Sequence, residues 1–145
     1  MLIQYTQNVG SLIQYQNHFA HCEADFIAAL TNRINLDDYI PKLIEKAVNF
    51  EAWEENQLIG LVNAYFNVST ETAYITNVSV IVGHQGKGIA SILLDKCIKF
   101  AIEKQLKSVS LEVASTNIKA QTLYKKYGFS ISGSKQDYFI MTKQI

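Results

Sequence analysis

The sequence predicts an α+β fold, because stretches with the repeat of a strand and stretches with the repeat of a helix follow one another along the chain. Residues 73–80 alternate between apolar and polar side chains, and residues 89–102 repeat their apolar side chains with helical spacing. A glycine-rich turn joins the two. The chain has 145 residues, near the commonest size of one domain, so we expect residues 1–145 to form a single domain.

The N-terminal third is predicted to contain one strand followed by helices. We expect a short strand at 2–5 and a helix that begins after Ser11, whose hydroxyl suits an N-cap. An apolar patch at 26–30 either continues this helix or begins another. Asn35 is expected to cap the next helix, in which Pro41 is tolerated because it falls near the first turn.

From residue 49 the pattern changes to strands, which two further helices interrupt. Ser115 or Thr116 is expected to cap the second of these helices, which carries Asn117, and Gly128 to end it in the left-handed conformation. The expected order is strand, two helices, three strands, helix, strand, helix and two strands. The strands expected after the first are 50–54, 58–68, 73–81, 108–113, 130–132 and 138–141.

Composition and charge argue against several classes of protein. The formal net charge is zero, which argues against non-specific nucleic-acid binding, and no run approaches the roughly 18 apolar residues of a membrane span. The N-terminus lacks the basic region and cleavage site of a signal peptide, so we expect a cytoplasmic protein with Cys22 and Cys97 as reduced core thiols. His18 and His21 have no third ligand spaced nearby, so no metal site is expected.

The zero net charge hides an asymmetry between two parts of the chain. Residues 1–80 contain three Lys or Arg and nine Asp or Glu, whereas residues 81–145 contain ten and four. One interpretation is an ordinary solvated surface. The other is a basic half that holds an anionic cofactor and an acidic half that faces a cationic substrate.

The glycine-rich turn has the sequence Gly83-His84-Gln85-Gly86-Lys87-Gly88-Ile89-Ala90. A strand, such a turn and a helix make a phosphate-binding arrangement, because glycine lets the backbone approach a ligand and the first N–H groups of a helix lack internal partners. A P-loop needs four residues between its glycines, and a Rossmann fingerprint needs a small residue where Ser91 stands, so neither motif fits. A flexible connection without a ligand remains an alternative.

Two motifs resemble those of the GNAT family of N-acetyltransferases. The acyl-CoA loop of that family, Arg/Gln-x-x-Gly-x-Gly/Ala, is matched by Gln85-Gly86-Lys87-Gly88-Ile89-Ala90. A second motif, Asn-x-x-Ala-x-x-Leu-Tyr followed by Gly-Phe, is matched from Asn117 to Tyr124 and by Gly128-Phe129. The resemblance implies a mixed, mostly antiparallel sheet of about six or seven strands flanked by about four helices.

The resemblance also implies acetyl-CoA as co-substrate and no metal. The main chain of the strand before the turn would pair with the pantetheine arm and stabilise the oxyanion, and the turn would hold the pyrophosphate. Lys119, Lys125 and Lys126 are candidates for reaching the 3′-phosphate. The implied cofactor-binding residues are Val78, Ser79, Val80, Gln85, Gly86, Lys87, Gly88, Ile89, Ala90, Asn117 and Tyr124.

Tyr124 is the implied catalytic residue, as the acid that protonates the departing thiolate. Many relatives place a Glu on the strand before the turn, but Thr76, Asn77 and Ser79 stand there and none is a useful base. Glu112 on the neighbouring strand is one candidate base. Deprotonation through water, or an acceptor of lower pKa, is the favoured alternative.

The expected activity is transfer of the acetyl group to a primary amine, a cationic small molecule or peptide, by direct attack on the thioester. Neither nucleic acid nor a membrane is expected as a partner, and both a monomer and a homodimer remain open. Two other classes also remain: a non-catalytic acyl-CoA-binding sensor and a nucleotide-binding domain. Candidates for the acceptor site are Asp37, Asp38, Glu45, Tyr39, Tyr65 and Tyr74, with helix capping and sheet packing as alternatives.

Overall fold

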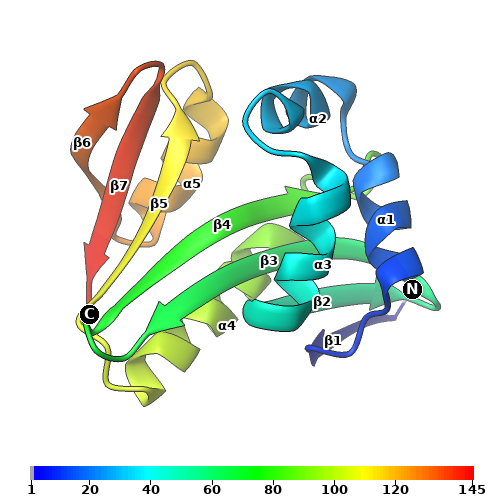
Figure 1. Ribbon diagram of the computed structural model, residues 1–145, viewed down its shortest axis with the longest axis horizontal. Helices are drawn as coiled ribbons and strands as arrows, with labels where there is room; N and C mark the ends of the chain where they lie inside the picture. Colours follow the sequence, from blue (N-terminus) through cyan, green and yellow to red (C-terminus); the bar gives the residue numbers. More distant parts are fainter. Residues whose placement is uncertain (1) are drawn as a thin grey trace.

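The computed structural model describes residues 2–145, and its centre is one seven-stranded sheet (Figure 1). The strand order is β1-β2-β3-β4-β5-β7-β6, and every neighbouring pair is antiparallel except β4 and β5. The predicted α+β fold with a mixed, mostly antiparallel sheet is therefore confirmed. The strands are β1 (Ile3–Gln7), β2 (Val48–Glu54), β3 (Gln57–Asn67), β4 (Thr72–Val80), β5 (Ser108–Ala114), β6 (Ser130–Lys135) and β7 (Tyr138–Gln144).

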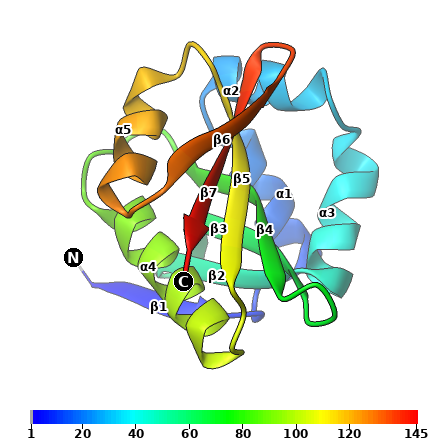
Figure 2. The same cartoon turned by 90° about the vertical axis from the view of Figure 1, so that its left-hand side faces the viewer.

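Helices lie on both sides of the sheet (Figure 2). One side carries α1 (Leu12–Ala20), α2 (Ala24–Thr31) and α3 (Leu36–Lys46), and the other carries α4 (Ile89–Glu103) and α5 (Ile118–Lys126). The described chain thus has five helices where about four were expected. The additional one is α2, because the apolar patch at 26–30 belongs to a helix of its own. None of the helices formed by residues 2–145 is long and apolar enough to cross a membrane.

Side-chain caps set two helix starts in the segment 11–47, which we call the N-terminal arm. Ser11 and Gln14 form a capping box, in which the Ser11 N–H donates to Gln14 Oε1 at 2.9 Å and the Gln14 N–H donates to Ser11 Oγ at 3.3 Å. Asn35 Oδ1 accepts from the Asp37 N–H at 2.9 Å. Both predicted N-caps of the arm are confirmed.

The prediction for Pro41 is wrong in one respect. Pro41 lies in the middle of α3 rather than near its first turn, so the helix lacks the hydrogen bond that an N–H would make there. Ile40 and Leu43, on either side of it, are 4% and 0% exposed and share an apolar cluster with Trp53 of β2. Their burial holds α3 on the sheet across the missing bond.

Two apolar clusters attach the helices to the sheet. The larger one packs α4, through residues such as Leu93 and Cys97, against the inner faces of the strands. The smaller one packs α1 and α3, through Phe19 and Leu43, against β2 and β3. Cys22 and Cys97 are both buried free thiols, as predicted.

Strands β4 and β5 run side by side only over their first residues. Thr72–Ile75 pair with Ser108–Leu111, and beyond them the two strands fan apart (Figure 1). We call this region the β4–β5 split. The register between β3 and β4 also shifts at this place. Asn63 pairs with Asn77, but the next residue, Ala64, pairs with Ile75. Thr76 is thus an extra residue in β4, as in a β-bulge. From there on, no strand within residues 2–145 pairs with β4 on its β5 side.

Gly60 of β3 sets how closely α4 approaches the sheet. A Cβ added at Gly60 would lie 2.5 Å from Ile89 Cγ2 and 3.2 Å from Leu93 Cδ1. We predict that Gly60→Ala lowers the free energy of unfolding by about 1–3 kcal/mol, because α4 must move outward or its side chains must leave their preferred rotamers.

Gly133→Ala on the edge strand β6 is the matched control. Its added Cβ would meet Ile140 at an ordinary 3.6 Å, so the free energy of unfolding should change by less than about 0.5 kcal/mol. Urea unfolding of both variants measures the difference. Equal losses in the two variants would contradict the role given to Gly60.

Candidate active site

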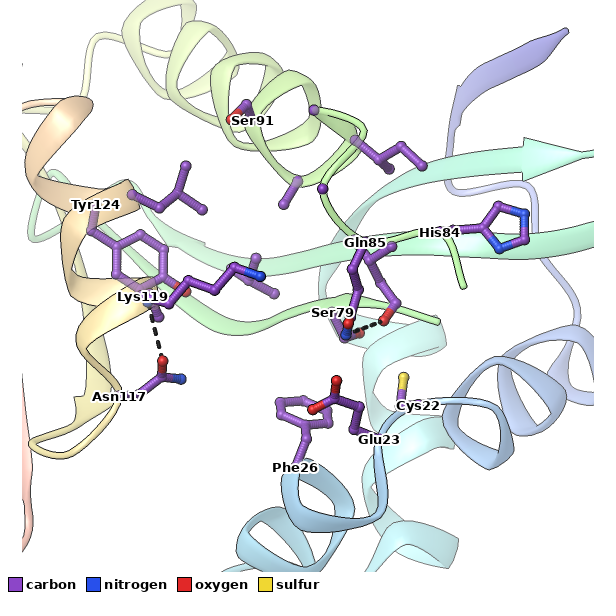
Figure 3. Close-up of a pocket in the computed structure, with 18 residues that line it drawn as sticks. Cys22, Glu23, Phe26, Ser79, His84, Gln85, Ser91, Asn117, Lys119 and Tyr124 are labelled. Atoms are coloured by element: carbon purple, nitrogen blue, oxygen red, sulfur yellow. Dashed lines mark hydrogen bonds between the residues drawn. The ribbon is translucent and has the colours of Figure 1, made fainter. Parts of the chain in front are cut away.

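A cavity of about 450 Å³ lies beside the β4–β5 split (Figure 3). Its wall comes from the α1–α2 junction, the end of β4, the glycine-rich turn with the start of α4, and α5. These parts are far apart in the sequence, and the fold brings them together. All the predicted cofactor-binding residues except Lys87 line it: Val78, Ser79, Val80, Gln85, Gly86, Gly88, Ile89, Ala90, Asn117 and Tyr124.

The glycine-rich turn presents main-chain donors without protein partners. Gly83, Gly86 and Gly88 have φ values of +88°, +79° and +79°, and a Cβ added at each would meet nothing within 4 Å. Backbone conformation, not packing, therefore requires glycine at these positions. Gly88 is the N-cap of α4 and its helix has no side-chain cap. Within residues 2–145, the N–H groups of residues 86–91 have no hydrogen-bond acceptor, as is usual for a helix start that faces an anion.

Asn117 occupies the start of α5 in a different role from the one predicted. The sequence predicted Ser115 or Thr116 as the cap of a helix that carries Asn117, but Asn117 is itself the N-cap. Its Oδ1 accepts from the Ala120 N–H at 3.1 Å, which leaves its Nδ2 as the group able to donate into the cavity. The Asn side chain is short enough to reach back to the third N–H of the helix, and this favours it at the cap.

Tyr124 projects from α5 into the cavity wall (Figure 3). Its side chain packs edge-on against Phe129, with ring centroids 6.0 Å apart, and the residue is 7% exposed. Its hydroxyl makes no hydrogen bond to any of residues 2–145, and burial raises its pKa above the ordinary value. Gly128, with φ +92°, turns the chain after α5 as predicted and brings Phe129 back onto the ring.

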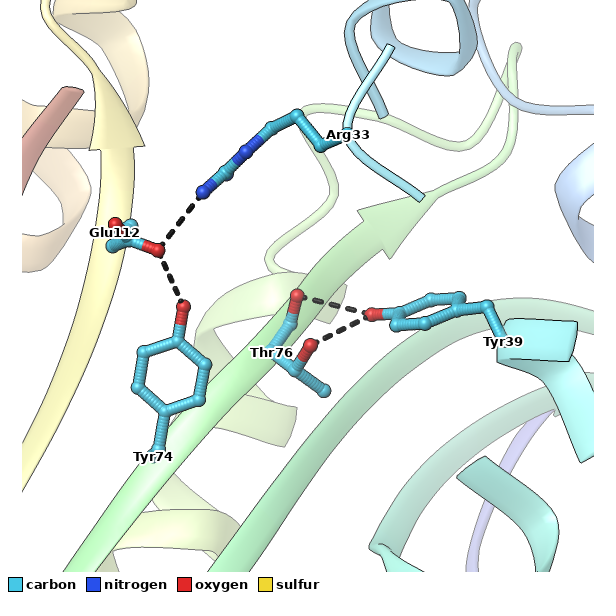
Figure 4. Close-up of polar contacts among 5 residues, drawn as sticks. All are labelled: Arg33, Tyr39, Tyr74, Thr76 and Glu112. Carbon is cyan, nitrogen blue, oxygen red and sulfur yellow. Dashed lines mark hydrogen bonds and ion pairs between the residues drawn. The ribbon is translucent and has the colours of Figure 1, made fainter. Parts of the chain in front are cut away.

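Glu112 lies at the β4–β5 split, one residue beyond Leu111, the last β5 residue that pairs with β4 (Figure 4). Its Oε2 accepts from Arg33 Nη2 and from the Tyr74 hydroxyl, both at 2.9 Å. Partial burial alone would raise the pKa of Glu112, but these donors outweigh it and hold the pKa below its ordinary value. Glu112 is therefore a fixed negative charge and a poor proton acceptor.

Tyr39 of α3 contacts the split from the N-terminal arm (Figure 4). Its hydroxyl lies 3.1 Å from the Thr76 carbonyl oxygen and 2.9 Å from Thr76 Oγ1. The Arg33 guanidinium stacks 4.0 Å from the centre of the Tyr138 ring. The predicted acceptor-site tyrosines Tyr39 and Tyr74 thus have hydrogen-bond partners in the protein itself.

The comparison with known families rests on most of the chain. The sequence profile described as the acetyltransferase (GNAT) family matches residues 14–129. The chain belongs to this family. The resemblance predicted from the two motifs is confirmed, and the match extends further toward the N-terminus than they do.

Two curated relatives of this GNAT chain are acetyltransferases with different acceptors. Over 91 residues the chain is 32% identical to streptothricin acetyltransferase from Escherichia coli. The aligned segment covers 61% of this chain and 51% of that protein. Over 95 residues it is 32% identical to the ribosomal protein bS18-alanine N-acetyltransferase of Haemophilus influenzae. This aligned segment covers 66% of this chain and 63% of that protein. The matches therefore span between half and two thirds of these relatives.

The fold is also that of solved GNAT structures. The structure of PaiA N-acetyltransferase from Thermoplasma acidophilum in complex with coenzyme A aligns with a TM-score of 0.77, covering 100% of both chains. The sequence identity is 17%, so the comparison concerns the fold alone.

The N-terminal arm contributes residues to the GNAT cavity that the sequence did not predict as site residues. Cys22, Glu23 and Phe26, at the α1–α2 junction, line it opposite the glycine-rich turn (Figure 3). The Val82 N–H donates to the His21 carbonyl at 2.9 Å, which ties the junction to the turn. These contacts join segments about 60 residues apart, so no local pattern predicts them.

His18 is buried beneath the same wall. Its Nδ1 lies 2.9 Å from the Leu58 carbonyl oxygen and its Nε2 lies 2.8 Å from Ser79 Oγ. A carbonyl oxygen only accepts, so Nδ1 carries the proton and Nε2 accepts from the Ser79 hydroxyl. Burial lowers the pKa of His18 to about 4, although the bond to Leu58 opposes the shift. His18 is thus a neutral, hydrogen-bonded core residue.

The buried His18 predicts a pH dependence of stability. Between pH 6.5 and about 4 the unfolded chain binds a proton at His18 that the folded chain excludes. The contribution of His18 is therefore fully present above pH 6.5, and about 3 kcal/mol is lost as the pH falls to about 4. Urea unfolding of the protein and of His18→Gln between pH 7.5 and 4 (a range chosen to bracket both values) tests this.

The His18→Gln variant should show a shallower loss of stability toward acid than the unchanged protein. His21→Gln, which replaces an exposed histidine at the end of the same helix, is the control. A loss toward acid that is the same with and without His18 would contradict the prediction.

Proposed function

We propose that this chain is an acetyl-CoA-dependent N-acetyltransferase that transfers the acetyl group to a primary amine by direct attack on the thioester. One observation carries the proposal: a single cavity joins the free donors of the glycine-rich turn, the unpaired side of β4 and the Tyr124 hydroxyl. Its volume of about 450 Å³ is in the range of cofactor sites. The relatives streptothricin acetyltransferase and bS18-alanine N-acetyltransferase support an amine acceptor.

The residues of the cavity fit coenzyme A. The unpartnered N–H groups of residues 86–91 would hold the pyrophosphate, with Lys87 adding positive charge from outside the wall. Val78, Ser79 and Val80 would offer their main chain to the pantetheine arm along the side of β4 that lacks a strand. Lys119 also lines the cavity, whereas Lys125 and Lys126 lie exposed in the last turn of α5. The bound cofactor supplies an acetyl thioester; the protein holds and orients it.

Tyr124 would provide the proton for the leaving group. As the amine nitrogen bonds to the acetyl carbon and the carbon–sulfur bond breaks, the sulfur leaves as a thiolate of ordinary pKa near 8.5. Burial raises the pKa of Tyr124, so its hydroxyl is protonated at neutral pH and available to donate. The hydroxyl has no competing partner in residues 2–145, which leaves it free to reach the sulfur.

The site favours an amine that loses its proton without a strong protein base. Thr76, Asn77 and Ser79 offer no carboxylate on β4, and Glu112 is already held by Arg33 and Tyr74. At pH 7 an alkyl ammonium of pKa about 10.4 is deprotonated in about one molecule in 2,500, but an N-terminal amine of pKa about 7.8 in about one in seven. We therefore propose water-relayed deprotonation and favour the α-amine of a peptide over a lysine-like amine.

Several broader features belong to the same proposal. Residues 1–145 would act as one catalytic domain in the cytoplasm, with a cationic small-molecule or peptide amine as partner and no nucleic acid or membrane. The choice between a monomer and a homodimer remains a prediction for solution measurement. A non-catalytic acyl-CoA sensor is the alternative that the missing carboxylate on β4 favours.

Tyr124→Phe tests the proposed reaction. We predict that it lowers kcat about 100-fold, because the thiolate then leaves without its proton donor, and changes the affinity for acetyl-CoA little. Release of coenzyme A is followed with a thiol reagent, using acetyl-CoA with streptothricin and with a peptide that begins with alanine. Tyr127→Phe, on the next turn and outside the cavity, is the matched control and should retain full activity.

Two results separate the hypotheses. Saturable acetyl-CoA binding without thiol release for any amine would favour the sensor. Activity unchanged in Tyr124→Phe would show that the phenol is not the acid.

A further inference from the structure

One acidic side chain lies in the cavity wall, on the side opposite the glycine-rich turn. Among residues 2–145, Glu23 is the only Asp or Glu that lines the cavity. Figure 3 shows its carboxylate pointing into the cavity from the α1–α2 junction. Glu23 is exposed, so a ligand that enters the cavity from solvent can reach it. The wall therefore presents one accessible negative charge.

The backbone beside Glu23 is held, but its carboxylate is free. Cys22, just before it, is 8% exposed, and Phe26 packs against the larger apolar cluster. The Glu23 carbonyl accepts from the Ile27 N–H at 3.0 Å. Its side chain does not cap α2, however, and none of the ion pairs within residues 2–145 includes it. The fold thus fixes where this side chain begins and leaves its charge available to a ligand.

Neither the cofactor nor the helix accounts for this charge. The turn, with its unpartnered N–H groups, and Lys119 suit an anion, which a carboxylate repels. An acid at a helix N-terminus can stabilise the helix dipole, and this is the alternative explanation. Asp25, in the first turn of α2, already supplies such a charge without lining the cavity. The cavity therefore has one side suited to an anion and, opposite it, a group suited to a cation.

In the proposed function the cationic ligand is the acceptor amine, so this inference rests on that function. We propose that Glu23 binds the amine and accepts its proton during transfer, directly or through one water. No carboxylate stands at Thr76, Asn77 or Ser79 of β4, so the N-terminal arm supplies the negative charge instead. Glu23 is thus the end point of the proposed water-relayed deprotonation.

The chemistry of a carboxylate suits this role. It attracts the ammonium form, and water takes the first proton, because a carboxylate is a weak base toward a free ammonium ion. The neutral amine then attacks, and its nitrogen gains positive charge as the carbon–nitrogen bond forms. A charge-assisted hydrogen bond to Glu23 strengthens at this stage. The nitrogen loses a proton to Glu23, the carbon–sulfur bond breaks and Tyr124 protonates the thiolate; water then returns the proton from Glu23 to the Tyr124 oxygen.

The test compares Glu23→Gln with Asp25→Asn, using acetyl-CoA with streptothricin and with an alanine-initial peptide. Both variants remove one negative charge at the start of α2, but only Glu23 lines the cavity. We expect Glu23→Gln to lower kcat/KM for the amine by about 10- to 100-fold and to leave KM for acetyl-CoA within about twofold. Asp25→Asn should stay within about twofold in both. Equal effects of the two variants, or a raised KM for acetyl-CoA alone, would overturn the proposal.

A second measurement needs no turnover. The protein is loaded with coenzyme A, and binding of the alanine-initial peptide is measured by calorimetry. Glu23→Gln should weaken this binding about fivefold, as expected for loss of one accessible ion pair. The same peptide with an acetylated N-terminus carries no charge there, so its affinity should be the same for both proteins.

The outcomes separate this inference from the proposed function. Equal affinity of both proteins for the free-amine peptide, or no binding of either this peptide or streptothricin, overturns the role of Glu23. Acetyl transfer that Glu23→Gln leaves unchanged refutes this inference and keeps the proposed function. Binding that depends on Glu23 without any acetyl transfer supports Glu23 as the amine-binding residue and refutes only the catalytic function.

Discussion

Parallel pairing between β4 and β5 stops after Ile75 and Leu111, and the arrangement of the whole site depends on that stop. Each strand leads into a helix: β4 into the glycine-rich turn and α4, and β5 into the Asn117 cap and α5. Because the strands diverge, the two helix starts are held apart with a cavity between them (Figure 3). Had the ladder continued to Val80, a strand would occupy the place where an extended ligand can bind.

The N-terminal arm closes the other side of the same opening, and polar contacts at the β4–β5 split add to its apolar packing on the sheet. Arg33 reaches Glu112 and stacks on Tyr138, and Tyr39 holds Thr76 at the bulge. The Arg33 side chain is 38% exposed, so its ion pair contributes at most about 1 kcal/mol to stability. The apolar cluster that packs Phe19 and Leu43 against β2 and β3, rather than this ion pair, therefore holds the arm on the sheet.

Local patterns in the sequence were enough for the parts of the site that lie within one turn or one helix. The turn at 83–90 and the Asn117–Tyr124 spacing identified the family, and both lie on the cavity as expected. The expected cap at Ser115 or Thr116 failed because three adjacent polar residues compete for that place and only geometry selects Asn117. The residue types also showed that β4 lacks a carboxylate, but they could not show that Glu112 is already bound by Arg33 and Tyr74.

Contacts between distant strands could not be predicted in this way. One example is the pair of buried hydrogen bonds that join Asn49, Asn63 and Asn77 across three strands. They depend on the register of β2, β3 and β4 and on the bulge at Thr76, which moves Asn77 opposite Asn63. A one-residue change of register would turn Asn77 to the opposite face of the sheet. No pattern within a single strand contains that information, so these hydrogen bonds become visible only in three dimensions.

Cys22 gives the cavity wall a chemical property of its own. A thioester held there would lie near a cysteine that could capture the acyl group and leave the protein self-acylated. Burial raises the pKa of Cys22 to about 11, so at pH 7 only about one molecule in 10⁴ carries the nucleophilic thiolate. The sulfur can thus fill space beside an activated acyl donor and remain inert toward it.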